Sequence, residues 1–245
     1  MRALYRITAV ELTLFLRDPA AYFWTLIFPV ALVAIIGIIP SAHEFSAELG
    51  GRVIDYYTPV ALVTSYAFLG LFVTPGYLVG YREKGVLRRL STTPVGPARV
   101  LTAQLSVQTA TAVVTTVLVL GMSAMLWDVE LPDHVGGFLL AFLLSVTAIL
   151  AIGSFLAAVV PTSKAVNAMG STLFFPLMFF AGLYVPTELL PAPVPAIADF
   201  TPLGAAVEAF GNAAENGWPG ITPSAVLAGY AAVFGLAAAR FFRWE

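Results

Sequence analysis

Residues 82–99 of this chain read REKGVLRRLSTTPVGPAR and separate two uncharged apolar runs, residues 56–81 and 100–127. The segment holds five of the twelve lysines and arginines in the chain. An apolar helix of about 20 residues crosses the hydrocarbon core of a bilayer, and each flanking run is longer than that. The pattern therefore predicts a basic loop that two transmembrane helices hold at a membrane surface.

The rest of the chain repeats this alternation of long apolar runs and short charged segments. Of the 245 residues, 59% are hydrophobic and 11% are charged, whereas a typical globular protein has about 25% charged residues. Six uncharged runs are long enough to cross a membrane: residues 21–40, 56–81, 100–127, 135–160, 165–187 and 221–239. We therefore expect an all-α polytopic membrane protein with six transmembrane helices in a single domain, residues 1–245.

The basic residues predict the orientation of these helices, because short loops rich in lysine and arginine stay in the cytoplasm. With the N-terminus inside, eleven of the twelve lysines and arginines lie on the inner side, and only Arg52 lies outside. The inverted orientation would place those eleven residues outside. We therefore expect both termini in the cytoplasm.

Three segments outside the six runs have patterns of their own. Residues 2–17 have the periodicity of an amphipathic helix in the headgroup layer, although Glu11 falls on its apolar side. Residues 82–91 fit a helix with a small apolar patch among basic residues. Residues 188–220 are too polar to span the membrane and too apolar for a free loop. We expect one or two short helices there, resting on or re-entering the outer leaflet.

The sequence offers no group of residues for catalysis. It has no G-x-x-x-x-G-K-[ST] loop for nucleotide, no cysteine, and only two histidines, both beside acids in predicted outer loops. The six runs contain no Asp, Glu, Lys or Arg, although ion-coupled carriers usually place an ionisable group inside the bilayer. We therefore expect that the protein is not itself an enzyme, that it has no metal site, and that a partner would supply the driving force for any transport.

Polar and small residues within the runs have structural interpretations. Gln104, Gln108, Thr111 and Thr115 recur at helical spacing, which favours hydrogen bonds to a neighbouring helix over a polar pathway. The segment Gly76–Gly80 has the small-xxx-small spacing that lets two helices approach closely.

The basic segment after the second run has two interpretations. Anionic lipid headgroups would attract its charge. Its apolar patch and its proline-bounded ends favour a docking helix for a cytoplasmic protein.

Four motifs in a fixed order resemble the ABC-2 type permeases, the membrane subunits of ATP-binding-cassette exporters. Arg82–Val95 is similar to the cytoplasmic loop of that family. Glu11–Pro19 leads into a run that contains Phe28-Pro29, as in the family. Phe179–Pro186, which reads FFAGLYVP, precedes a proline-rich outer segment with Thr201-Pro202-Leu203. The resemblance extends over essentially the whole chain.

The resemblance implies partners and roles for these segments. Residues 2–17 would be a connecting helix, 82–94 the coupling helix that sits in a groove of the ATPase, and 188–220 outer re-entrant helices. Family members combine two permeases with two ATPases in the bacterial plasma membrane. It therefore implies two ABC ATPase subunits that hold ATP and Mg, a second permease copy or close paralogue, and no nucleic acid. The implied ATPase contacts are Arg82, Glu83, Lys84, Gly85, Val86, Leu87, Arg88, Arg89 and Leu90.

The resemblance also implies a substrate path between the two permeases, lined largely by the second and fifth runs. The candidate residues are Tyr66, Phe68, Phe72, Asn167, Ser171, Phe175 and Phe179. Since these runs are apolar and aromatic, the expected cargo is a hydrophobic or amphiphilic drug, antibiotic or lipid that leaves the cytoplasm. Two other functions fit the sequence: an ion-coupled secondary carrier, and a non-transporting membrane assembly or immunity factor that holds a partner with the same loop.

Overall fold

The structure is a computed structural model, and it describes residues 2–91 and 97–242. Its α-helices are α1 (Arg2–Leu16), α2 (Pro19–Tyr22), α3 (Phe28–Gly37), α4 (Val53–Phe68), α5 (Thr74–Glu83), α6 (Val86–Ser91), α7 (Pro97–Trp127), α8 (Val135–Val159), α9 (Ser163–Phe180), α10 (Val194–Ala198), α11 (Pro202–Glu215) and α12 (Ile221–Phe241). Two π-helical segments, η1 (Phe23–Ile27) and η3 (Leu69–Val73), continue α2 into α3 and α4 into α5. Two 3-10 turns, η2 (Pro40–His43) and η4 (Thr187–Leu189), and a hairpin of β1 (Phe45–Ser46) and β2 (Gly51–Arg52) complete the described elements.

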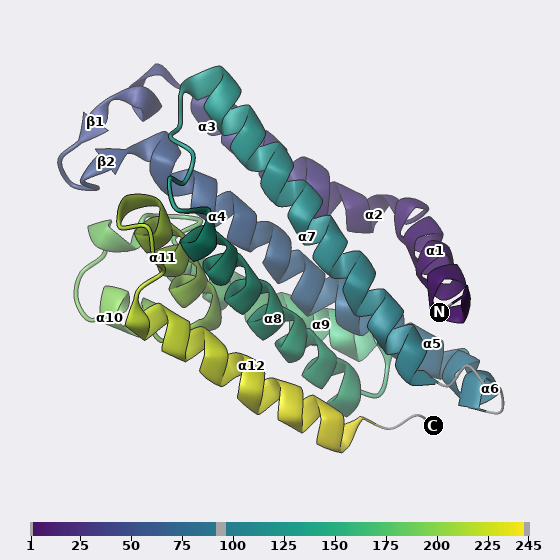
Figure 1. Ribbon diagram of the computed structural model, residues 1–245. Coiled ribbons are helices and arrows are strands. Elements are labelled where there is room, and N and C mark those ends of the chain that lie inside the picture. Colours follow the sequence, from purple (N-terminus) through teal and green to yellow (C-terminus); the bar gives the residue numbers. More distant parts are fainter. Residues whose placement is uncertain (1, 92–96, 243–245) are drawn as a thin grey trace.

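The long helices lie side by side in an elongated bundle (Figure 1). One end of the bundle carries the start of α1, the short helix α6 and the end of α12, and we refer to it as the α6 end. The hairpin β1–β2 and helix α10 lie at the opposite end. Helix α8 lies inside the bundle and packs against α12, α11, α5 and η3.

Five continuous helical stretches are long and apolar enough to cross a membrane: Pro19–Gly37, Val53–Glu83, Arg99–Trp127, Val135–Val159 and Ile221–Phe241. They match five of the six predicted runs to within a few residues. The expectation of an all-α polytopic membrane protein is confirmed.

The sixth predicted run, residues 165–187, is shorter in the structure. Its helix α9 spans Ser163–Phe180, and the chain turns at Gly182, whose φ of 76° suits glycine. The first half of α9 carries the polar residues Ser163, Lys164 and Asn167, and α9 is not among the five apolar stretches. An 18-residue helix is about 27 Å long. A sixth crossing therefore stays a prediction.

The second run is longer than predicted, and this divides the expected coupling helix. Arg82 and Glu83 belong to the last turn of α5, and the helix stops at Gly85, which has a φ of 64°. A separate helix, α6, covers Val86–Ser91. Residues 92–94 of the predicted 82–94 helix lie outside the described residues.

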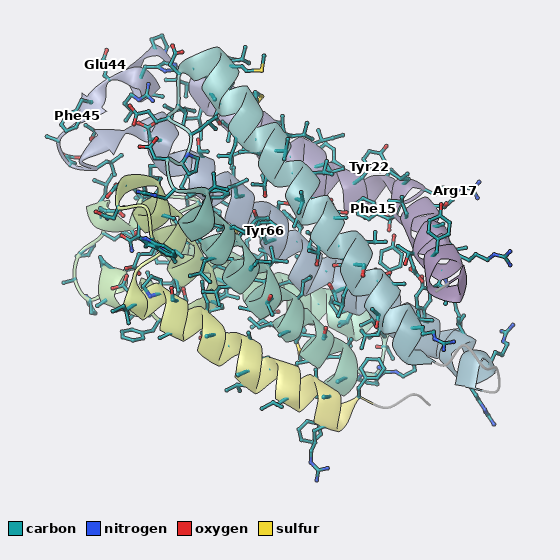
Figure 2. The ribbon with its side chains drawn as sticks, viewed as in Figure 1. Phe15, Arg17, Tyr22, Glu44, Phe45 and Tyr66 are labelled. Atoms are coloured by element: carbon teal, nitrogen blue, oxygen red, sulfur yellow. The ribbon has the colours of Figure 1, made fainter. Side chains whose placement is uncertain are left out.

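Helix α1 lies against the bundle through its buried side chains. Phe15 is buried and Arg17 points away into the surroundings, as Figure 2 shows. The carboxylate of Glu11 is also buried and accepts a hydrogen bond of 2.6 Å from the hydroxyl of Tyr81 in α5. Burial raises the pKa of Glu11, and the hydrogen bond from Tyr81 partly offsets this. The acid that interrupts the apolar face of α1 is therefore both paired and turned toward protein.

The segment predicted as outer re-entrant helices, residues 188–220, contains α10 and α11. Helix α11 packs against α8, α12, α4 and α9, and it buries Leu203 and Phe210. The hydroxyl of Thr201 accepts a hydrogen bond from the backbone N–H of Gly204 and so caps α11.

Candidate functional site

A cavity of about 670 Å³ opens between the first two membrane helices and α9. Asp18 lines it from the α1–α2 turn, while Glu83 and Lys84 line it from the end of α5. Trp24 of η1 and Phe72 of η3 form part of its wall. The charged lining residues thus lie at helix ends, and two of the aromatic ones, Trp24 and Phe72, lie on the π-helical segments.

The aromatic wall is a cluster of rings in contact. Trp24 stacks on Phe68, with ring centroids 5.0 Å apart and planes 22° apart. Phe68 in turn contacts Phe72 at 5.5 Å and Phe174 of α9 at 4.7 Å. A π-helical turn contains one extra residue and so changes the direction of the side chains that follow, and such turns occur often at functional sites.

Proline explains why the first membrane helix has a free carbonyl at this point. The residue four positions after Thr25 is Pro29, which has no N–H to donate to the Thr25 carbonyl. Two hydroxyls from other helices replace that donor: Ser65 of α4 at 2.6 Å and Thr115 of α7 at 2.9 Å. All three residues are fully buried, so these bonds satisfy a carbonyl that water does not reach.

The second π-helical segment is stabilised in a similar way. The hydroxyl of Thr74 donates to the carbonyl of Leu69, and Gln108 of α7 contacts the same hydroxyl at 2.5 Å. With the Thr115 bond to Thr25, these contacts confirm the predicted bonds to neighbouring helices for Gln108 and Thr115, whereas the hydroxyl of Thr111 donates within α7.

Two glycines leave space for the backbone of η3 to approach closely. A Cβ atom at Gly153 of α8 would overlap the carbonyl of Gly70, and one at Gly170 of α9 would lie 2.6 Å from the carbonyl of Leu71. The expected close approach at Gly76 and Gly80 is absent, because a Cβ at either position meets no described atom within 4 Å. Both glycines line the cavity instead.

The last residues of α5 hold the turn between α8 and α9. The guanidinium of Arg82 donates to the carbonyls of Ala157, at 3.0 Å, and Val160 at the end of α8. The carboxylate of Glu83 accepts from the N–H of Ser163, at 2.9 Å, and from its hydroxyl at the start of α9. A cation at a helix C-terminus and an anion at a helix N-terminus both complement the helix dipole. We call these contacts the Arg82–Glu83 clamp.

A family model described as ABC-2 type transporter matches residues 2–213. The chain belongs to the ABC-2 type transporter family. The matched region runs from α1 into α11 and includes the cavity, the Arg82–Glu83 clamp and α6. The resemblance noted in the sequence is therefore confirmed. No curated protein matches the chain.

As an ABC-2 type transporter, the protein is the membrane-spanning permease component of an ABC transporter, and the family in general works with an ABC ATPase. In this permease, three of the seven predicted path residues line the cavity: Phe68, Phe72 and Asn167. Ser171 and Phe175 are exposed on α9, and Phe179 is half-buried.

Tyr66 does not line the cavity. It is 1% exposed, and its hydroxyl shares a hydrogen bond of 2.7 Å with Thr116 of α7. Its ring packs against Phe142 of α8 and Phe210 of α11. Residues two apart on a helix differ by about 200° in direction, so Tyr66 and Phe68 cannot face the same space. Tyr66 is therefore a core residue in this conformation, and its place on a substrate path stays a prediction.

The nine residues predicted to contact the ATPase fall into two groups. The side chains of Arg82 and Glu83 bond to the α8–α9 turn and form the clamp, although Glu83 remains exposed. Lys84, Arg88 and Arg89 are exposed around α6, where Arg89 donates to the carbonyl of Lys84 at 3.2 Å. Gly85 forms the turn and Val86 is half-buried, while the side chains of Leu87 and Leu90 lie outside the described part. Their docking stays a prediction.

Sequence reasoning missed Asp18, Trp24 and Tyr77 as cavity residues. Tyr77 donates a hydrogen bond of 3.2 Å to the carboxylate of Asp18. The proline four residues after Thr25 is the signal that could have marked the first membrane helix, because it predicts a disturbed helix near Trp24.

Proposed function

We propose that this permease moves a hydrophobic or amphiphilic substrate, such as a drug, an antibiotic or a lipid, out of the cytoplasm. A separate ABC ATPase, present in two copies with ATP and Mg, supplies the energy. A second copy of this permease or a close paralogue completes the transporter.

One observation carries the proposal. Glu83 and Lys84 line the cavity, and the docking helix α6 begins two residues later, at Val86. A movement of α6 would therefore act directly on the lining of the cavity. A docking helix remote from any cavity would offer no such connection.

The Arg82–Glu83 clamp extends this connection to other helices. It joins α5 to the end of α8 and the start of α9. When an ATPase moves α6, we expect α5 and the α8–α9 turn to move as one body, because packed helices shift as rigid elements. The first membrane helix also lines the cavity and lies outside this clamped body, so the motion would change the width between that helix and α5 with α9.

The distribution of basic residues supports a cytoplasmic α6 end. The start of α1, helix α6 and the end of α12 share this end of the bundle (Figure 1). Among the described residues, Arg2 begins α1, Arg88 and Arg89 belong to α6, Arg82 lies in the last turn of α5, and Arg240 lies in the last turn of α12. We therefore propose that both termini are cytoplasmic, in a bacterial plasma membrane, and that α10–α11 lies at the outer side.

The proposal can be tested by changing the docking helix and its clamp. The permease is isolated from its native membrane with its ATPase and reconstituted in vesicles, and export is measured with hydrophobic and amphiphilic compounds. Leu87→Asp and Glu83→Ala should each abolish export and leave membrane insertion intact. Glu130→Ala, an exposed acid at the opposite end, is the matched control and should export normally.

Three outcomes would contradict the proposal. Normal export by the Leu87→Asp protein would remove α6 as the docking helix. Uphill transport by the permease alone, driven by an ion gradient, would indicate a secondary carrier. An associated ATPase whose hydrolysis responds to no substrate would indicate an assembly or immunity factor.

A further inference from the structure

The lining of the cavity has an excess of negative charge. Asp18 and Glu83 line it, with Lys84 as the basic lining residue. The carboxylate of Asp18 accepts hydrogen bonds from two neutral donors, the N–H of Ala21 at 3.1 Å and the hydroxyl of Tyr77 at 3.2 Å. Within residues 2–91 and 97–242, no Lys or Arg of this chain forms an ion pair with Asp18. Its charge therefore stays available to a bound cation.

The interior of the cavity presents aromatic faces. Trp24 is 40% exposed, stacks on Phe68 and is joined by Phe72 in the wall. The face of an aromatic ring attracts cations, and tryptophan does so most strongly. The same rings provide a large apolar surface for the body of a ligand. The negative charge and the aromatic surface of the cavity thus both favour a cation with an apolar body.

The glycines of α5 provide the space for such a molecule. A Cβ at Gly76 or Gly80 would meet no described atom within 4 Å. Asp18 precedes Trp24 by six residues, and Phe68 precedes Tyr77 by nine. At 1.5 Å per residue, the carboxylate and the aromatic cluster are separated by about 9–14 Å along the helices. A ligand that contacts both needs a positive charge and apolar surface within a molecule about 9–14 Å across.

We propose that this cavity binds an amphiphilic organic cation. A quaternary ammonium, protonated amine or phosphonium group lies beside Asp18, and the apolar body lies against Trp24, Phe68 and Phe72. The proposal rests on the proposed function, since it names the chemical class of the substrate. It narrows the expected cargo from any hydrophobic compound to one that carries a positive charge.

Binding to the purified full-length permease in neutral maltoside micelles tests the proposal. The probes are tetraphenylphosphonium and tetraphenylborate, which have nearly the same shape and opposite charge. Asp18→Asn should weaken tetraphenylphosphonium binding by about tenfold, because it removes one charge from a partly buried site. Tetraphenylborate binding should stay equal or become tighter. Asparagine caps helices as well as aspartate does, so the start of α2 is preserved.

Two further variants locate the site. Gly76→Leu fills the open space and should abolish binding of both probes. Asp133→Asn removes an exposed acid far along the chain from the cavity and should change neither probe. Equal affinity of the wild type and Asp18→Asn for tetraphenylphosphonium would overturn the proposal, as would unchanged binding by Gly76→Leu. A permease that binds no cation because a second copy fills the cavity would overturn it too, and cross-linking of the two copies through position 76 would identify that case.

The cation can belong to a soluble amphiphile or to a lipid headgroup. Addition of phosphatidylethanolamine to the micelles separates these sources. Displacement of tetraphenylphosphonium would show that a lipid ammonium group occupies the cation site. Unchanged binding would support a soluble amphiphile as the occupant of the same site. The binding measurement needs no ATPase, so the two proposals can fail separately. Absence of tetraphenylphosphonium binding together with loss of export by Leu87→Asp would reject only the substrate class. Cation binding together with normal export by Leu87→Asp would reject only the docking helix.

Discussion

The paired hydroxyls at the Thr25 carbonyl predict a strongly non-additive loss of stability. We consider Ser65→Ala and Thr115→Val, alone and together. Each single variant removes one donor, at 2.6 Å or 2.9 Å, and leaves the other in place. Only the double variant leaves the carbonyl buried without a donor, because Pro29 supplies none.

The expected magnitudes follow from this arrangement. A hydrogen bond between membrane helices contributes about 0.6 kcal/mol on average, so the two single variants together should cost about 1.2 kcal/mol. A buried carbonyl without any partner costs about 1–3 kcal/mol more. The double variant should therefore lose about 3 kcal/mol, with a coupling energy of about 2 kcal/mol between the two positions.

Unfolding by sodium dodecyl sulfate in mixed micelles, followed by circular dichroism, measures these free energies. The matched control cycle is Ser154→Ala with Thr111→Val. Both hydroxyls are buried and donate only to carbonyls four residues earlier in their own helices. The control losses should add to within about 0.5 kcal/mol. If the Ser65 and Thr115 losses were also additive, the carbonyl would have another donor and the reasoning would be wrong.

Three other predictions concern a close contact, the clamp and a buried acid. Gly153→Ala should destabilise the fold by about 2–3 kcal/mol, because the new methyl overlaps the backbone of η3, whereas Gly229→Ala, with no neighbour within 4 Å, should be neutral or stabilising in the same unfolding titration. Glu83→Gln should speed amide hydrogen exchange in the first turn of α9, where the carboxylate now accepts from the helix start, and unchanged exchange would argue against the clamp. Burial raises the pKa of Glu11 above its ordinary value of 4.5, so the contribution of Glu11 to stability should be greatest below pH 4.5 and fall as the pH rises through the raised pKa. Glu11→Gln should abolish that fall and be the more stable protein at pH 7, and a wild-type stability independent of pH would contradict this.

The helices were predictable because hydropathy acts over twenty residues and needs no knowledge of neighbours. Five apolar runs became helices with nearly the expected bounds. The sixth run was predicted too long because its apolar residues continue past Gly182, where a positive φ ends the helix. Hydropathy does not register such a turn.

The site was only partly predictable because it depends on which helix faces meet. Phe68 and Tyr66 belong to the same run and have similar chemistry, yet one lines the cavity and the other is buried on the opposite side. Side-chain patterns did not indicate the clamp, because within the described residues Arg82 donates to main-chain oxygens. In the sequence it resembled the other basic residues predicted to contact a partner. Asp18 was hidden for a similar reason, because it lies far along the chain from the α5 residues that share its cavity.

The clamp has a consequence for how this turn can vary between species. Three of its four contacts end on main-chain atoms: two are carbonyl oxygens, which every amino acid supplies, and one is an N–H, which every amino acid except proline supplies. The turn can therefore change its side chains over evolutionary time without losing its attachment, as long as its length is kept. The α8–α9 turn is held by two residues of another helix, Arg82 and Glu83, and Glu83 precedes its partner Ser163 by eighty positions.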